Sequence, residues 1–303
     1  MGDTAIEYVD KSWNPLAMRC TRVSPGCDHC WHLRMCKRHA ANAHFPYEVR
    51  EAYAGGEPVM CEKILREPLG WRTVKRVAVQ FMGDLFHESV GLFPVARIFC
   101  IMRHAALHQF YVLTKRPEIM AEYIKPRTRG GLPILPNVIL GTTVEDQERA
   151  DERLPHLMKL ARMGWRTWVS VEPMLERMEL TPWLPDGPGQ NLGDIHHRGL
   201  DWVIVGGETG PGARPMHPDW VRDVRDQCVA AGVPFFFKGW GDWAPAANGH
   251  APDCWKIGSF QPDGSFRRDS WIGSASDCMA RVGKKRAGRL LDGVEHNELP
   301  GKE

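Results

Sequence analysis

The feature that most constrains the fold is a series of short hydrophobic runs, each separated from the next by a segment that can form a helix. Strands are predicted at 5–13, 74–81, 109–115, 137–143, 166–172, 201–208 and 233–239. Helices are predicted at 28–42, 94–107, 117–123, 146–163 and 218–231. Near-continuous hydrophobicity is typical of parallel strands covered on both faces. The alternation therefore predicts right-handed βαβ units in an α/β fold.

Six or seven such repeats favour a single partial β/α barrel of the (β/α)6 type, similar to a TIM barrel with loop insertions. We expect this barrel to occupy residues 1–241. Residues 242–303 are expected to add insertion loops and a C-terminal helical extension to the same domain. Two stretches rich in Gly, Pro, Asp and Asn, 184–199 and 242–273, predict surface loops or short hairpins.

Composition indicates a globular chain with free thiols. The 303 residues are 43% hydrophobic, and no run of eighteen apolar residues occurs. The nine cysteines are an odd number, and six of them are scattered singly, which is unlike a secreted disulfide framework. The acidic N-terminus lacks the order of a secretory signal. We expect a soluble protein of a reducing compartment, with no membrane partner.

Charge is spread unevenly along the chain. Residues 1–130 hold 19 Lys and Arg against 13 Asp and Glu, a balance of +6, and the remainder holds 20 against 24, a balance of −4. A basic N-terminal half that faces an anionic substrate is one interpretation, and chance partition of surface charge is the other.

Polar residues follow the predicted strands at the ends where β/α barrels place their chemistry. In strand order, these residues are Asp84, Lys115, Arg116, Thr142, Thr143, Glu145, Glu172, Glu208 and Lys238. Their convergence after so many strands predicts one site at the carboxyl edge of the sheet.

The segment "CTRVSPGCDHC" places Cys20, Cys27 and Cys30 in a C-x6-C-x2-C pattern just after the first strand. Three thiolates can anchor a [4Fe–4S] cluster that keeps one iron open for an exogenous ligand. A structural zinc site would need a fourth ligand, for which the candidates are Cys36, His29, His32 and His39. Three thiols without a metal are the remaining alternative.

In this position the loop resembles that of the radical S-adenosylmethionine (SAM) superfamily, whose usual motif is C-x3-C-x2-C. Longer segments, "SWNP", "VSPGCDHCW", "MGDLFHE", "LTKRP", "GTTVEDQERADERLPHL", "VSVEPM", "VIVGGETGPGARPMHPDWVRDVRDQC", "PFFFKGWG" and "GKKRAGRLLDG", are in this order similar to the three-Cys-motif phage protein family. That family is an uncharacterised domain of phages and mobile elements, and the similarity covers nearly the entire chain.

The resemblance implies that Cys20, Cys27 and Cys30 hold a [4Fe–4S] cluster and that the open iron binds SAM. Reductive cleavage of SAM would give a deoxyadenosyl radical that removes a hydrogen atom from the substrate. By position, the cofactor-binding residues would be Gly83, Asp84, Thr143, Glu145, Gly206, Gly207 and Glu208. The catalytic candidates are Lys115, Glu172 and Lys238, and the substrate-binding candidates are Arg116, Trp240 and Trp243. Exposed rings of the two tryptophans could stack on a base, and packing in a core, the more common setting for tryptophan, is the alternative.

The family context implies an isomerase of phage DNA hypermodification that rearranges an amino-acid-modified thymidine in the cytoplasm of the bacterial host. DNA and an electron donor such as flavodoxin or ferredoxin would be its partners. Nucleic-acid lesion repair by hydrogen abstraction is a second enzymatic interpretation. A non-catalytic, zinc-stabilised nucleic-acid-binding module is the alternative from a different class.

Overall fold

The computed structural model describes residues 4, 6–125, 133–185, 199–246, 257–268 and 277–301. They form two compact units. The first comprises residues 1–143 and 153–168, and the second comprises residues 144–152 and 169–303. Most of the predicted loop at 184–199 and part of that at 242–273 lie outside the described residues.

A seven-stranded sheet is the main element, with the order β1-β4-β5-β6-β7-β8-β9. The pairs β1–β4, β4–β5, β5–β6 and β8–β9 are parallel. The strands are β1 (Lys11–Trp13), β4 (Arg76–Val79), β5 (Gln109–Thr114), β6 (Val138–Val144), β7 (Arg166–Val171), β8 (Trp202–Gly206) and β9 (Phe235–Gly239). The α/β class is confirmed, and the sheet is compatible with a partial β/α barrel.

The helices that alternate with these strands lie close to their predicted ranges. They are α4 (Leu92–His104), α5 (Pro117–Ile124), α6 (Gln147–Arg162) and α7 (Pro218–Ala231). In α7, Pro218 occupies the first turn and Gly232 ends the helix in the left-handed conformation, with φ 68°. Both residues suit these positions, because proline is favoured in a first turn and glycine in a left-handed cap.

In the first unit, the side chain of Trp168 packs closely against Gly141 of strand β6. Every residue of β6 is buried. A Cβ on Gly141 would lie 2.3 Å from Nε1 of Trp168, which itself donates a hydrogen bond to the Val112 carbonyl at 3.1 Å. Glycine at position 141 therefore lets the indole pack flat against the strand.

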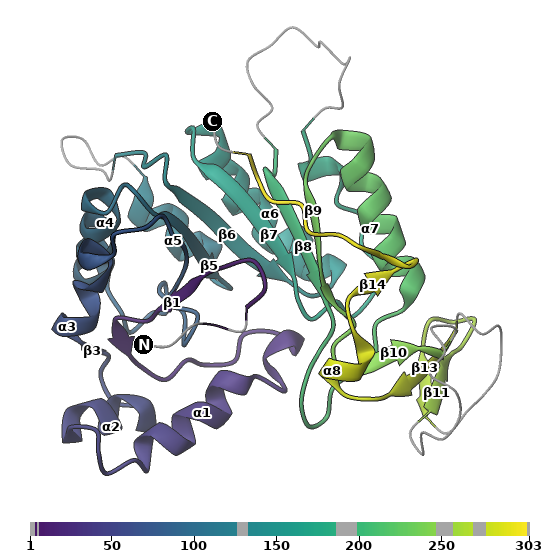
Figure 1. Cartoon of the computed structure of the whole chain (residues 1–303), viewed down its shortest axis with the longest axis horizontal. Helices are drawn as coiled ribbons and strands as arrows, with labels where there is room; N and C mark the ends of the chain where they lie inside the picture. Colours follow the sequence, from purple (N-terminus) through teal and green to yellow (C-terminus); the bar gives the residue numbers. More distant parts are fainter. Residues whose placement is uncertain are drawn as a thin grey trace, which may run out of the picture. The chain divides into compact units, whose positions relative to one another are not determined.

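Smaller elements complete the two units. In the first unit these are α1 (Trp31–Ala40), α2 (Tyr47–Ala54), α3 (Glu62–Leu65), the 3-10 turns η1 (Pro25–Cys27) and η2 (Glu67–Gly70), and the pair β2 (Leu16–Ala17) and β3 (Val59–Met60). The helices α1 and α2 pack on each other (Figure 1).

The second unit holds η3 (Thr181–Trp183), β10 (Trp243–Pro245), β11 (Ile257–Phe260), β12 (Phe266–Arg268), β13 (Cys278–Arg281), α8 (Lys284–Ala287), β14 (Leu290–Leu291) and β15 (Val294–Glu295). Strands β10 to β13 form an antiparallel sheet in the order β10-β13-β11-β12. The β11–β12 pair is a hairpin of the kind predicted within 242–273. No helix in the described residues is long and apolar enough to cross a membrane.

Candidate functional site

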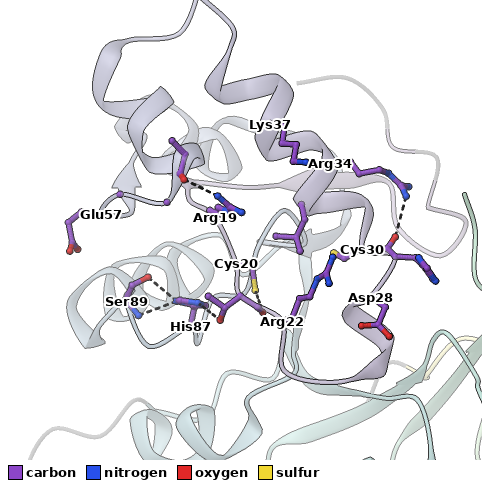
Figure 2. Close-up of a pocket in the computed structure, with 16 residues that line it drawn as sticks. Arg19, Cys20, Arg22, Asp28, Cys30, Arg34, Lys37, Glu57, His87 and Ser89 are labelled. Atoms are coloured by element: carbon purple, nitrogen blue, oxygen red, sulfur yellow. Dashed lines mark hydrogen bonds between the residues drawn. The ribbon is translucent and has the colours of Figure 1, made fainter. Parts of the chain in front are cut away.

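The cysteine loop and α1 border a cavity of about 990 Å³ in the first unit (Figure 2). Cys20 and Cys30 both line it. The charged side chains at its wall are Arg19, Arg22, Arg34, Lys37, Asp28 and Glu57. Four cations against two anions give the lining a formal charge of +2 with neutral histidines.

Local turns bring the three cysteines into one loop. Pro25 opens the 3-10 turn η1, where the Cys27 amide donates to the Ser24 carbonyl at 2.9 Å. The Cys30 amide then donates to the Cys27 carbonyl at 3.3 Å, and α1 begins at the next residue. Cys27 is buried within this turn, whereas Cys20 and Cys30 are only partly covered. The chain therefore reverses direction at "SPG", just before Cys27.

Arg116 joins this loop to the strand ends. Its guanidinium donates to the Asp84 carboxylate at 3.1 Å, to Glu88 at 2.9 Å and to the Thr21 hydroxyl at 2.7 Å. It also donates to the Cys20 sulfur at 3.7 Å. Only 2% of the Arg116 side chain is exposed. The structure thus gives Arg116 an anchoring role and leaves its side chain inaccessible to the substrate that it was predicted to bind.

Asp84 is the acceptor at the centre of the same network. Its carboxylate receives the Thr114 hydroxyl at 2.6 Å and the Lys115 amide at 3.1 Å, in addition to the Arg116 guanidinium. Asp84 and Arg116 are both predicted site residues, and the structure brings them into direct contact. In this arrangement the carboxylate oxygens of Asp84 and the guanidinium of Arg116 hold the cysteine loop in place.

Electrostatics at Cys20 reflect its setting between these groups. Burial, together with the nearby Asp84 charge, raises the pKa of the Cys20 thiol to about 12, although Arg116 acts in the opposite direction. Burial would lower the pKa of Arg116, but its bond to Glu88 and the charge of Asp84 together hold that pKa well above its usual range. Arg116 therefore stays charged beside the sulfur.

The metals that the sequence suggests for this loop are an iron–sulfur cluster and zinc. Among the residues that the structure describes, no three His, Cys, Asp or Glu side chains are grouped so as to hold a metal ion. Three sulfur side chains within eleven residues, two of them facing a cavity, nevertheless supply the donors that an iron–sulfur cluster takes. The residue types of the loop therefore suit that group, whereas the three sulfurs are not gathered around one point in the described chain.

The proposed fourth ligands for zinc are largely engaged in packing. Cys36 and His32 are buried, and the Cys36 sulfur lies 3.3 Å from Nε2 of His32. His39 stacks on Tyr53 with ring centroids 4.8 Å apart. His29 alone among the four candidates lines the cavity. A zinc site closed by four ligands would require Cys36, His32 or His39 to leave these contacts, or the His29 ring to turn toward the three cysteine sulfurs.

Three more predicted residues of the first unit have clear surroundings. Gly83 has φ 124°, and a Cβ there would lie 2.8 Å from the Met18 side chain, so that the turn after β4 requires glycine. Thr143 is buried, and its carbonyl accepts from Arg153 at 2.8 Å. Lys115 is partly exposed and follows β5 directly.

The remaining predicted residues belong to the second unit. The Lys238 ammonium lies 2.6 Å from the Glu172 carboxylate, and both side chains are partly exposed. A Cβ on Gly206 would lie 3.3 Å from Cβ of Lys238 and 3.4 Å from Cδ of Glu172. The structure therefore brings together these two catalytic candidates, which come from β9 and from the end of β7.

Glu208 and Glu145 are also buried in the second unit. Glu208 accepts three hydrogen bonds from Arg214, from its main-chain amide at 2.8 Å and its guanidinium at 2.9 and 2.8 Å. The carbonyl of Glu145 accepts from the Leu175 amide at 2.8 Å. The Glu208–Arg214 pair fixes the loop that follows β8.

Trp240 and Trp243 correct one expectation. Each side chain is about 2% exposed. The indole of Trp240 donates to the Leu290 carbonyl at 2.9 Å, and that of Trp243 to the Ala213 carbonyl at 2.8 Å. Both rings pack in the core because their polar edges find main-chain partners there. Exposed rings for base stacking are not present at these positions.

Gly207 lies against the main chain of Trp240 and gives a stability prediction. A Cβ at residue 207 would lie 2.1 Å from the Trp240 carbonyl oxygen, so we expect Gly207→Ala to lower the free energy of unfolding by about 3 kcal/mol or more. Urea unfolding measures this loss. Gly70→Ala is the matched control, because nothing lies within 4 Å of that Cβ. Equal unfolding midpoints for the two variants would contradict the packing.

The sequence analysis did not single out the cations of the cavity wall. Arg19 and Arg22 flank Cys20, whereas Arg34 and Lys37 come from α1. A signal for them existed in the basic balance of residues 1–130. Charge alone does not show which of nineteen cations share a surface.

Comparison with known proteins assigns the chain to a family. No curated protein and no solved structure matches it. A family model described as "Protein of unknown function (DUF5131)" matches residues 3–300. An uncharacterised family over nearly the whole chain agrees with the expectation from the sequence, whereas phage origin and a radical SAM relationship stay predictions. The chain belongs to the DUF5131 family of proteins of unknown function.

Proposed function

We propose that this protein is a radical SAM enzyme whose [4Fe–4S] cluster is held by Cys20, Cys27 and Cys30. The observation that carries the proposal is the three-cysteine loop after the first strand, with Cys20 and Cys30 open to a cavity of positive charge. Three thiolate anchors suit a cluster with one free iron. The cationic wall suits an anionic cofactor or substrate beside it.

Cys20, Cys27 and Cys30 would hold the cluster, which would supply one electron, received from a flavodoxin or ferredoxin, for the reductive cleavage of SAM to methionine and the deoxyadenosyl radical that would take a hydrogen atom from the substrate. The protein's own contribution is positional. Arg116 holds the Cys20 end of the loop through Thr21 and the sulfur itself. Asp84 keeps that guanidinium in place.

The substrate part of the proposal is an amino-acid-modified thymidine in DNA, which the enzyme would isomerise within a bacterial cell that carries phage genes. The cationic cavity supports an anionic substrate of this kind. Lys238 and Glu172 form the one close pair among the catalytic candidates of the second unit. A lyase that repairs nucleic-acid lesions would use the same cofactors and a similarly charged substrate.

The test of the proposal is the metal content of the protein purified without oxygen. We expect brown protein with about four iron and four sulfide per chain. Reduction in the presence of SAM should yield deoxyadenosine. Colourless protein with one zinc per chain would contradict the enzyme and favour a zinc-stabilised binding module. Mass analysis of digested DNA after incubation separates rearrangement of a modified base from repair.

A further inference from the structure

We infer that the cysteine loop and α1 form a binding surface for a single strand of nucleic acid. The surface consists of Arg19, Arg22, Trp31, Arg34, Lys37 and Arg38. The inference rests on the proposed function only in taking the adjoining cavity as the reaction site. It replaces Arg116, Trp240 and Trp243, which are buried, as the contacts to a nucleic acid.

The cations of this surface are available to an anionic partner. Arg22 and Lys37 are exposed, and neither pairs with a carboxylate in the described part of the chain. Arg19 and Arg34 each donate one hydrogen bond to a main-chain carbonyl, those of Ala54 and His29, and pair with no carboxylate of the described residues. Figure 2 shows Arg34 and Lys37 projecting from α1, and Arg19 and Arg22 from the loop before it.

The helix spacing places these groups on one side of α1. Cys30, Leu33, Arg34 and Lys37 line the cavity, and their spacing of three, four and seven residues defines one helical face. The ten residues of α1 contain no Asp or Glu. The charged side chains of this face, Arg34 and Lys37, are therefore both cations, with no acidic residue on the helix to offset them.

An exposed aromatic ring borders the same face. Trp31 is 47% exposed at the first position of α1, directly after Cys30. Arg34 and Arg38 follow Trp31 by three and seven residues, so the three side chains form a row along the edge of the cavity-lining face, to which Arg34 itself belongs. An indole in solvent next to guanidinium groups is the combination that stacks a base while it pairs with phosphates.

This combination favours a single strand over a duplex or a small anion. The bases of a duplex are stacked on each other, so an exposed indole can cover a base face only when the strand is open. A single small anion would use two or three of the cations and would leave Trp31 without a partner. The cations of the cysteine loop and of α1 together can pair with several consecutive phosphates of one strand.

Fluorescence anisotropy of a fluorescein-labelled single-stranded DNA twelve-mer with the full chain tests the inference. If four phosphates are neutralised, we expect affinity to fall about fifty-fold between 50 and 200 mM salt. Lys37→Ala and Arg22→Ala should each reduce the salt slope by about 0.7. Trp31→Ala should weaken binding by about tenfold with an unchanged slope, and Trp31→Phe should keep most of the affinity.

Two variants on α4 provide matched controls. Arg103 is an exposed cation and Phe93 an exposed ring, and neither lines the cavity. Arg103→Ala and Phe93→Ala should bind the twelve-mer like the unmodified chain. Equal affinity for a duplex of the same length, or losses no larger than those of the controls, would overturn the inference.

Binding is measured without SAM or reductant, so it separates this inference from the proposed function. If the chain lacks iron but binds the strand through Trp31 and Lys37, the binding surface is supported and the radical chemistry is contradicted. If the chain holds about four iron atoms but does not bind the strand, the cluster is supported and the binding surface is contradicted.

Discussion

Replacing Cys27 by alanine is expected to reduce iron from about four per chain to less than one and to abolish deoxyadenosine formation. The physical reason is the number of anchors. Three thiolates hold three corners of a cluster, and two sulfurs in a short loop leave two corners exposed to exchange and loss. Iron and sulfide assays on anaerobically purified protein measure the effect.

Matched cysteine variants make this result specific. Cys100 is exposed on α4 and lies outside the loop, so Cys100→Ala should retain its iron. Cys36→Ala should also retain iron, because that thiol packs against His32 and the Met18 carbonyl. Loss of metal in Cys36→Ala would show that a fourth protein ligand closes the site. If Cys27→Ala retained its iron, the assignment of the three cysteines as cluster ligands would be wrong.

The parallel sheet could be predicted from the sequence because its strands carry their own signal. Runs such as 137–143 and 201–208 are hydrophobic on both faces, which few helices or loops are. Proline and glycine marked the ends of α7 for equally local reasons. The sheet of β10 to β13 was less visible, since its strands are three or four residues long within a stretch of loop composition.

Side-chain partnerships were the part that the sequence could not provide. Arg116 and Thr21 are 95 residues apart, and only the folded chain shows that their side chains meet. The same holds for Trp240, whose indole finds a carbonyl 50 residues away and is thereby buried. The residue types alone therefore predicted that polar groups follow the strands. Which of these groups face solvent depends on tertiary contacts, which the sequence does not show.

Replacing Arg116 by methionine is expected to lower the free energy of unfolding by about 3–5 kcal/mol, because it leaves the Asp84 carboxylate buried without its counter-charge. The lost bond to the largely exposed Glu88 should add little. Urea unfolding gives the energy. The rate of Cys20 alkylation by iodoacetamide reports the loop, and it should rise as the contacts of Arg116 with Thr21 and the sulfur disappear.

A double variant and a surface pair identify the cause of this loss. Asp84→Asn combined with Arg116→Met removes both charges, so part of the lost stability should return. Arg97 forms a comparable two-pronged pair with Glu62 at the surface, where water screens both charges, so Arg97→Ala should leave the free energy of unfolding nearly unchanged. If the Arg116 variant were no less stable than the Arg97 variant, or if Cys20 reacted no faster, Arg116 would not be the anchor of the cysteine loop.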